Sequence, residues 1–168
     1  MLENRPFFRF HPGAYDRVFE PSDAVCVICE APCVWRYTGS IYLARKPDPV
    51  CARCIATGRI EAFAPGQFGQ LHDADIAGAS AKLVQEVLQR TPGFDTYNPF
   101  EWPVVDGEPL AFIGHGDDPA VWKDPAVQAA INAMFNEAGW DHGDGPSPYA
   151  LVFRSLRTGA FVAVMDLD

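Results

Sequence analysis

No stretch of this 168-residue sequence reaches the roughly eighteen uninterrupted apolar residues that a membrane-spanning helix requires, so a membrane span is not expected. The first sixteen residues also lack the basic segment, apolar run and small-residue cleavage site of a secretory signal, which predicts a cytoplasmic protein. A glycine-rich phosphate loop and a serine in a nucleophile elbow are both absent from the sequence. Because these motifs are missing, we expect a protein that is not an enzyme.

Basic residues are scarce in the second part of the chain. The sequence holds 13 Lys and Arg against 22 Asp and Glu, for a formal net charge of −9. Residues 1–60 carry eight basic and six acidic side chains, whereas residues 61–168 carry five and sixteen. Such an acidic surface repels a phosphate backbone and attracts a basic protein partner, so nucleic-acid binding is disfavoured. A simpler interpretation is that the carboxylates keep the protein soluble.

Four of the five cysteines form two Cys-x-x-Cys pairs. Cys26 and Cys29 form the first pair, and Cys51 and Cys54 form the second after 21 intervening residues. Two such pairs supply the four thiolates of a tetrahedral zinc, and a catalytic zinc would keep one open position, so we predict one structural Zn²⁺. The alternative is a set of buried free cysteines or a redox pair. Cys33 is expected to be a small buried side chain, or a spare thiol that can replace a neighbour.

Turn residues and apolar periodicity predict one α+β domain over residues 1–168, with a zinc module at about 22–60. Three β-hairpins are expected, at residues 34–43, 104–113 and 149–167. Two main helices are expected, one from about Ser80 to Arg90 and one from Asp124, with Pro125 at its first position, to a stop at Gly139.

A set of motifs covers most of the chain in a fixed order. They are Phe10-His11-Pro12, CVIC at 26–29, the segment from Tyr37-Thr38-Gly39 to Tyr42, CARCIATG at 51–58, RTPGF at 90–94, Trp102, AFIG at 111–114 and YALVFR at 149–154. In these motifs the chain resembles the CbrC family of small bacterial proteins, which is named for tolerance to a colicin. The resemblance implies an immunity-type protein, and it carries no established enzymatic activity.

The same resemblance bears on the number of metal ions. The family pattern has a His or Cys pair shortly after the tryptophan and a Cys-Leu-His-Cys-Gly turn near the C-terminus. Here those places hold Val105-Asp106 and residues 155–159, SLRTG. Both halves of a second metal site are therefore missing together, and the resemblance implies one zinc rather than two.

The leading hypothesis is a non-catalytic immunity or antitoxin protein that binds and neutralises a cognate bacterial toxin domain with a basic surface. The acidic second part of the chain would supply the binding surface. We expect Asp106, Glu108, Asp117 and Asp118 to contact this partner, because they cluster on one predicted hairpin and its exit.

Two other functions remain open. A zinc-ribbon nucleic-acid or regulatory module would use the aromatic and basic residues around the cysteines, namely Trp35, Arg36, Tyr37, Arg45, Lys46, Arg53 and Arg59. A metal-dependent hydrolase would use His115 and His142 with nearby carboxylates, and would need a second metal away from sulfur. His11 is expected to make a structural hydrogen bond. Tyr97, Phe100 and Trp102 are expected either to cover the core or to anchor a protein interface.

Overall fold

The protein is described by a computed structural model that covers residues 5–41, 43, 45–63, 65, 68, 78–98, 102–143 and 145–167. The predicted α+β class with a four-cysteine cluster near the N-terminus is confirmed. Within the described residues, small antiparallel sheets alternate along the chain with helices of 4–13 residues. None of these helices is long and apolar enough to cross a membrane.

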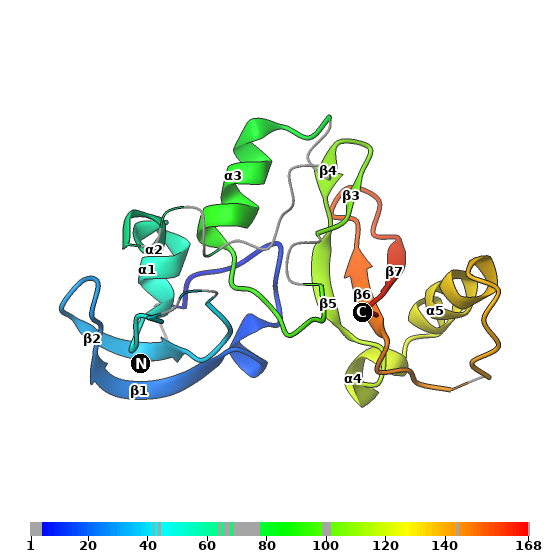
Figure 1. Ribbon diagram of the computed structural model, residues 1–168, viewed down its shortest axis with the longest axis horizontal. Helices are drawn as coiled ribbons and strands as arrows, with labels where there is room; N and C mark the ends of the chain where they lie inside the picture. The colour runs from blue at the N-terminus through cyan, green and yellow to red at the C-terminus, as the bar shows by residue number, and fades with distance from the viewer. Residues whose placement is uncertain are drawn as a thin grey trace.

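The first half of the chain builds the cysteine-bearing end of the molecule (Figure 1). After a 3-10 turn at Ala14–Asp16, strand β1 (Phe19–Val25) pairs antiparallel with β2 (Pro32–Tyr37). Two short helices follow, α1 (Ala52–Ala56) and α2 (Arg59–Phe63). The first Cys-x-x-Cys pair lies in the connection between the two strands, and the second lies at the start of α1.

The prediction of a hairpin at residues 34–43 is wrong, because residues 34–37 pair with the preceding strand β1 and not with a following strand. Gly39 therefore does not form the turn of a hairpin. A Cβ atom at this position would collide with the ring of Tyr37, whose hydroxyl donates to the Ser40 carbonyl at 3.2 Å. The glycine therefore permits close packing of an aromatic ring. Tyr42, in the second predicted arm, lies outside the described residues.

The second half contains a three-stranded antiparallel sheet in the order β5 (Ala111–His115), β6 (Ala150–Arg154), β7 (Phe161–Met165). The predicted hairpin at 149–167 is confirmed as β6 and β7. The one predicted at 104–113 forms only a two-residue ladder, β3 (Val104–Val105) with β4 (Glu108–Pro109). The last residues of this predicted hairpin, 111–113, belong instead to β5. This strand pairs with β6, because its apolar residues are buried in the sheet.

Both predicted helices are confirmed. Helix α3 (Ala81–Arg90) follows Ser80, which occupies the N-cap position without making a side-chain cap bond. Helix α5 (Pro125–Glu137) begins after Asp124, whose Oδ1 accepts from the Ala126 N–H at 2.9 Å, and it packs against β7. Helices α1, α2 and α4 (Pro119–Trp122) were not predicted, since four or five residues are too few to show a helical period.

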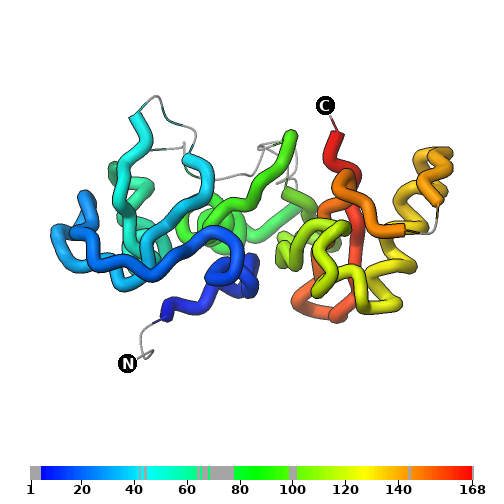
Figure 2. Tube along the Cα trace, turned by 90° about the horizontal axis from the view of Figure 1, so that it is seen from below, coloured from blue at the N-terminus to red at the C-terminus, as the bar shows by residue number. Residues whose placement is uncertain are grey.

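Helix α3 and the N-terminal segment connect the two ends of the molecule (Figures 1 and 2). Phe112 on β5 donates its N–H to the Phe10 carbonyl at 2.8 Å, so the segment around residue 10 lies along the sheet. Phe94, just after α3, stacks on the Phe112 ring with centroids 3.9 Å apart. Buried aromatic side chains thus carry the core from the sheet towards the cysteine-bearing end.

Candidate functional site

The four paired cysteines converge from two places in the chain. Cys26 follows β1 directly, and its turn is closed by bonds from Cys26 N–H to the Ala31 carbonyl and from Glu30 N–H to the Cys26 carbonyl, both 2.9 Å. Cys51 is the N-cap residue of α1, and Cys54 lies within that helix. The tip of the β1–β2 hairpin and the first turn of α1 therefore face each other.

The sulfur atoms have the spacing of a metal site. All four Sγ atoms lie within 4.8 Å of one another, and the distances from Cys26 to Cys54 and from Cys29 to Cys51 are both 3.8 Å. A tetrahedron of sulfurs at about 2.3 Å from a central zinc has edges of roughly 3.8 Å, whereas a disulfide would need about 2.05 Å. The cysteines are free thiols, and the cluster can hold one metal ion.

Burial controls the protonation of this cluster. It raises the pKa of Cys54 and of Cys51, because a thiolate loses its hydration in the interior. Cys29 is more accessible; burial opposes its ionisation, but hydrogen bonds from the Ala31 backbone and the neighbouring thiols lower its pKa to about 7. Several thiolates so close together need a cation between them, and a metal ion would displace the protons.

Cys33 lies outside the group of four sulfurs. It is 5% exposed, and burial, followed by the nearby Cys26 and Cys51, raises its pKa to about 12. Such a thiol is a poor nucleophile and a poor ligand in competition with its neighbours. The structure therefore places Cys33 as a small buried side chain next to the cluster.

The strands leading to the cluster contain unusual backbone geometry. Glu30, in the turn with the cysteines, has φ +56°, and Val34, one residue after Cys33, has φ +59°. This left-handed conformation is uncommon for any residue except glycine and is strained for a β-branched one. The register between β1 and β2 also shifts between Ser22 and Val25. Local strain is therefore concentrated where the chain bends to present its cysteines.

The four predicted partner-binding carboxylates lie at the two ends of β5. Asp106, in the β3–β4 turn, is paired with Arg157 at 2.5 Å. Asp118 caps α4 through Ala120 N–H at 2.8 Å and pairs with Arg17 at 2.7 Å, and this hydrogen bond with Arg17 lowers its pKa. Glu108 is half-buried on β4 and Asp117 is exposed after β5. The structure therefore separates them into two pairs.

The two histidines proposed for hydrolytic chemistry, His115 and His142, do not share a site. His115 on β5 donates from Nε2 to the Asp95 carbonyl at 2.7 Å, whereas His142 lies against the ring of Phe135 after α5, with centroids 3.9 Å apart. Among the described residues, the four cysteines are the only group of three or more possible ligands close enough to share a metal. His72, Phe100 and Asp144 lie outside the described residues.

His11 makes the structural hydrogen bond that the sequence predicts. It is fully buried, and its Nδ1–H donates to the Pro92 carbonyl at 3.0 Å. Burial is the main cause that lowers its pKa to about 4, so the ring is neutral at pH 7. Its edge contacts Phe112, with centroids 5.1 Å apart. His11 thus ties the N-terminal segment to the loop after α3.

Two structural features were missed by the sequence reasoning. Arg5 stacks on the ring of Trp35 at 3.9 Å beside the cysteine cluster. Asp166 is 3% exposed and binds the loop at residues 96–98 through its carboxylate. The only sequence signal for Asp166 is a carboxylate placed directly after an apolar strand, which is too common to identify a site.

The fold and the site define a class of small α+β proteins in which a four-cysteine cluster, able to hold one metal ion, joins a β-hairpin to a helix. The chain belongs to UPF0167, an uncharacterised protein family whose model matches residues 5–166. The resemblance drawn from the sequence is confirmed at the level of this family, and the CbrC name itself is not shown.

The relatives are bacterial proteins. UPF0167 protein PA1536 of Pseudomonas aeruginosa is 33% identical over 112 residues, which span 65% of this chain and 63% of the relative. UPF0167 proteins Mb2317 of Mycobacterium bovis and MT2352 of Mycobacterium tuberculosis are each 32% identical over 175 residues, covering 96% of this chain and 92% of theirs. No solved structure matches the chain.

Proposed function

We propose that the cysteine cluster binds one structural Zn²⁺ and that the protein is a cytoplasmic, non-catalytic binding protein of the immunity or antitoxin type. The observation that carries the proposal is the closed set of four sulfurs at tetrahedral spacing. With all four coordination positions taken by thiolates, the metal has no open position for a substrate and has a structural role. The function then lies on protein surfaces that this metal site stabilises.

Thiolate chemistry supports zinc as the metal. Four sulfurs in a tetrahedron suit Zn²⁺ or iron, whereas Ca²⁺ and Mg²⁺ require oxygen ligands. Elemental analysis of protein purified without added metal should give one zinc per chain. One iron per chain with a visible absorption band, or no metal at all, would refute the zinc assignment.

The charge distribution supports a basic partner. Residues 61–168 carry the acidic excess, and within the described residues Glu108 and Asp117 form no direct ion pair, Glu108 having only a longer-range attraction to Arg9. Asp106 and Asp118 already pair with arginines of this chain, so their charges are partly neutralised. We therefore expect Glu108 and Asp117 to contribute more to partner binding than Asp106 and Asp118 do.

Charge reversal at these two positions tests the partner surface. The double variant Glu108→Lys, Asp117→Lys should lose co-purification with a basic toxin domain encoded beside this gene, and should no longer protect cells that express it. The matched control is Asp16→Lys, Asp23→Lys, which makes the same charge change at exposed positions in the first half of the chain. Full protection by the first variant would show that the proposed surface is wrong.

A second function, single-stranded nucleic-acid binding, is favoured by one observation. Beside the cysteine cluster, a groove of about 270 Å³ is lined by Arg5, Arg53 and Trp35. An aromatic ring and two guanidinium groups in one groove suit a stacked base and its phosphate. Binding of a short RNA at low salt, weakened by Trp35→Ala and by added salt, would support this function. An absence of any salt-dependent binding would exclude it.

A further inference from the structure

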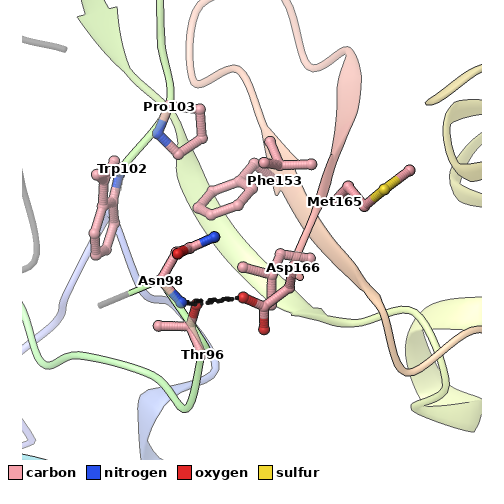
Figure 3. Close-up of a pocket in the computed structure, with 9 residues that line it drawn as sticks. Thr96, Asn98, Trp102, Pro103, Phe153, Met165 and Asp166 are labelled. Atoms are coloured by element: carbon pink, nitrogen blue, oxygen red, sulfur yellow. Dashed lines mark hydrogen bonds between the residues drawn. The ribbon is translucent and has the colours of Figure 1, made fainter. Parts of the chain in front are cut away.

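A cavity of about 270 Å³ lies beside β7, in the half of the molecule that contains the three-stranded sheet (Figures 1 and 3). Trp102 lies on one side of it and Met165 on the other, with Phe153 between them. Trp102 and Phe153 are at most 1% exposed, and the indole N–H of Trp102 donates to the Leu110 carbonyl at 2.8 Å. The apolar walls are therefore held in place, and they suit an aromatic or aliphatic body.

The polar part of this cavity is centred on Asp166. Its Oδ1 accepts three hydrogen bonds, from Thr96 Oγ1 at 2.7 Å, from Tyr97 N–H at 2.9 Å and from Asn98 N–H at 3.3 Å. Within the described part of the chain, no donor reaches the second oxygen, Oδ2. Oδ2 is not one of the fully buried atoms without a hydrogen-bond partner, so this oxygen of a residue that is 3% exposed still reaches solvent beside the apolar cavity.

A second cavity, of about 520 Å³, shares Thr96 and Asp166 with the first. Asp95 and Asp117 also line it, and His115 is fixed in its wall by the bond to the Asp95 carbonyl. No lysine or arginine lines either cavity among the described residues. Three carboxylates in a lining that holds no lysine or arginine among the described residues make this a negative site, and the apolar cavity lies next to it.

We propose that the two cavities form one binding site for a small organic cation, an ammonium or guanidinium group carried on an aromatic or short aliphatic body. The cation donates to Asp166 Oδ2, and the body packs against the partly exposed apolar side chains of Pro103, Val164 and Met165, which Trp102 and Phe153 support from beneath. An anion is repelled by the carboxylates, and a neutral group of the same shape gives up the charge-assisted hydrogen bond. Ligand binding at this site requires no protein partner and no metal, so it can be tested independently of the proposed function.

A matched set of three ligands tests the charge requirement on the full-length protein. Phenethylamine, 2-phenylethanol and 3-phenylpropionate share a ring and a short stem but carry a cation, no charge and an anion. Titrations followed by NMR should show saturable shifts of the Trp102 indole N–H and the Met165 methyl with the amine. The alcohol should bind about tenfold more weakly or worse, and the anion should not bind. Equal binding of amine and alcohol, or no saturation with the amine, overturns the proposal.

The variant Asp166→Asn isolates the role of Oδ2. Its amide oxygen can still accept from Thr96, Tyr97 and Asn98, but an NH₂ group replaces Oδ2 and cannot accept from an ammonium. Amine affinity should fall about tenfold or more. Asp23→Asn makes the same charge change on β1 and should keep full affinity. Equal weakening in both variants would show a general charge effect and refute the site. If Asp166→Asn does not fold, the ligand series on the unmodified chain decides.

Discussion

Gly93 donates its backbone N–H to the phenolic oxygen of Tyr37 at 3.2 Å, across 56 residues of sequence. Tyr37 ends β2 in the cysteine-bearing half, and Gly93 follows α3, so this bond joins the two halves of the fold. Tyr37 is 1% exposed, and its hydroxyl also donates to the Ser40 carbonyl. One hydroxyl therefore satisfies two backbone groups from separate segments.

Removal of that hydroxyl should lower stability without changing the fold. In Tyr37→Phe the Gly93 N–H loses its acceptor, and we expect the free energy of unfolding to fall by about 1–3 kcal/mol. Urea unfolding measures this loss. Tyr149→Phe is the matched control, because Tyr149 is 47% exposed and should change stability by less than about 0.5 kcal/mol. Equal stability of the two variants would contradict the linking role of Tyr37.

Loss of one thiolate should remove the metal and unfold the N-terminal half. Cys51→Ser leaves three of the four sulfurs, and structural zinc contributes on the order of 10 kcal/mol in small zinc modules. Elemental analysis and thermal unfolding should both report the loss, and a strong chelator should reproduce it. Cys33→Ala should retain one metal per chain, because Cys33 lies outside the four-sulfur group. Full zinc content and native stability in Cys51→Ser would refute the assignment.

The buried His11 should make stability depend on pH. Its pKa in the folded state is about 4, below the unfolded value of about 6.5, so the unfolded chain binds more protons between these values. The contribution is fully present above pH 6.5 and is lost as pH falls towards 4, by at most about 3 kcal/mol. Urea unfolding at several pH values should show this slope.

A histidine replacement separates this effect from other titrations. His11→Asn cannot titrate, so its stability should vary less between pH 6.5 and 4 than that of the unmodified chain, whatever its absolute stability. His142→Gln, which alters a histidine packed near the surface against Phe135, should keep the full slope. The same slope in both variants would show that other groups cause the pH dependence.

The left-handed backbone at Val34 predicts a stabilising substitution. A β-branched residue at φ +59° carries strain of roughly 1–2 kcal/mol that asparagine tolerates better. Because Val34 is 61% exposed, Val34→Asn loses little packing and should raise the thermal midpoint. Val25→Asn is the control, since Val25 is similarly exposed on β1 without a positive φ. A lower midpoint for Val34→Asn would contradict the strain.

The features that follow from short stretches of sequence were predictable. Helix α5 has an Asp-Pro start and an apolar stripe, and the β6–β7 hairpin closes over a short turn, so neighbouring residues determine both. The two Cys-x-x-Cys pairs also indicated the cluster that can hold a metal ion, because each pair forms one turn and a shared metal needs only that the two turns meet.

The pairing of distant segments was decided by the tertiary structure. Residues 34–37 have the same β-forming character whether they pair forwards or backwards, and burial of the Tyr37 ring against Gly39 selects β1 as the partner. Likewise, sequence proximity grouped Asp106 with Asp118, but β5 separates them and each meets a distant arginine. By itself the sequence determined the α+β class, the main helices and the four thiols that can hold a metal ion. The strand partners, the separation of the carboxylates and the free oxygen of Asp166 depend on contacts between residues far apart in the chain, which local patterns do not encode.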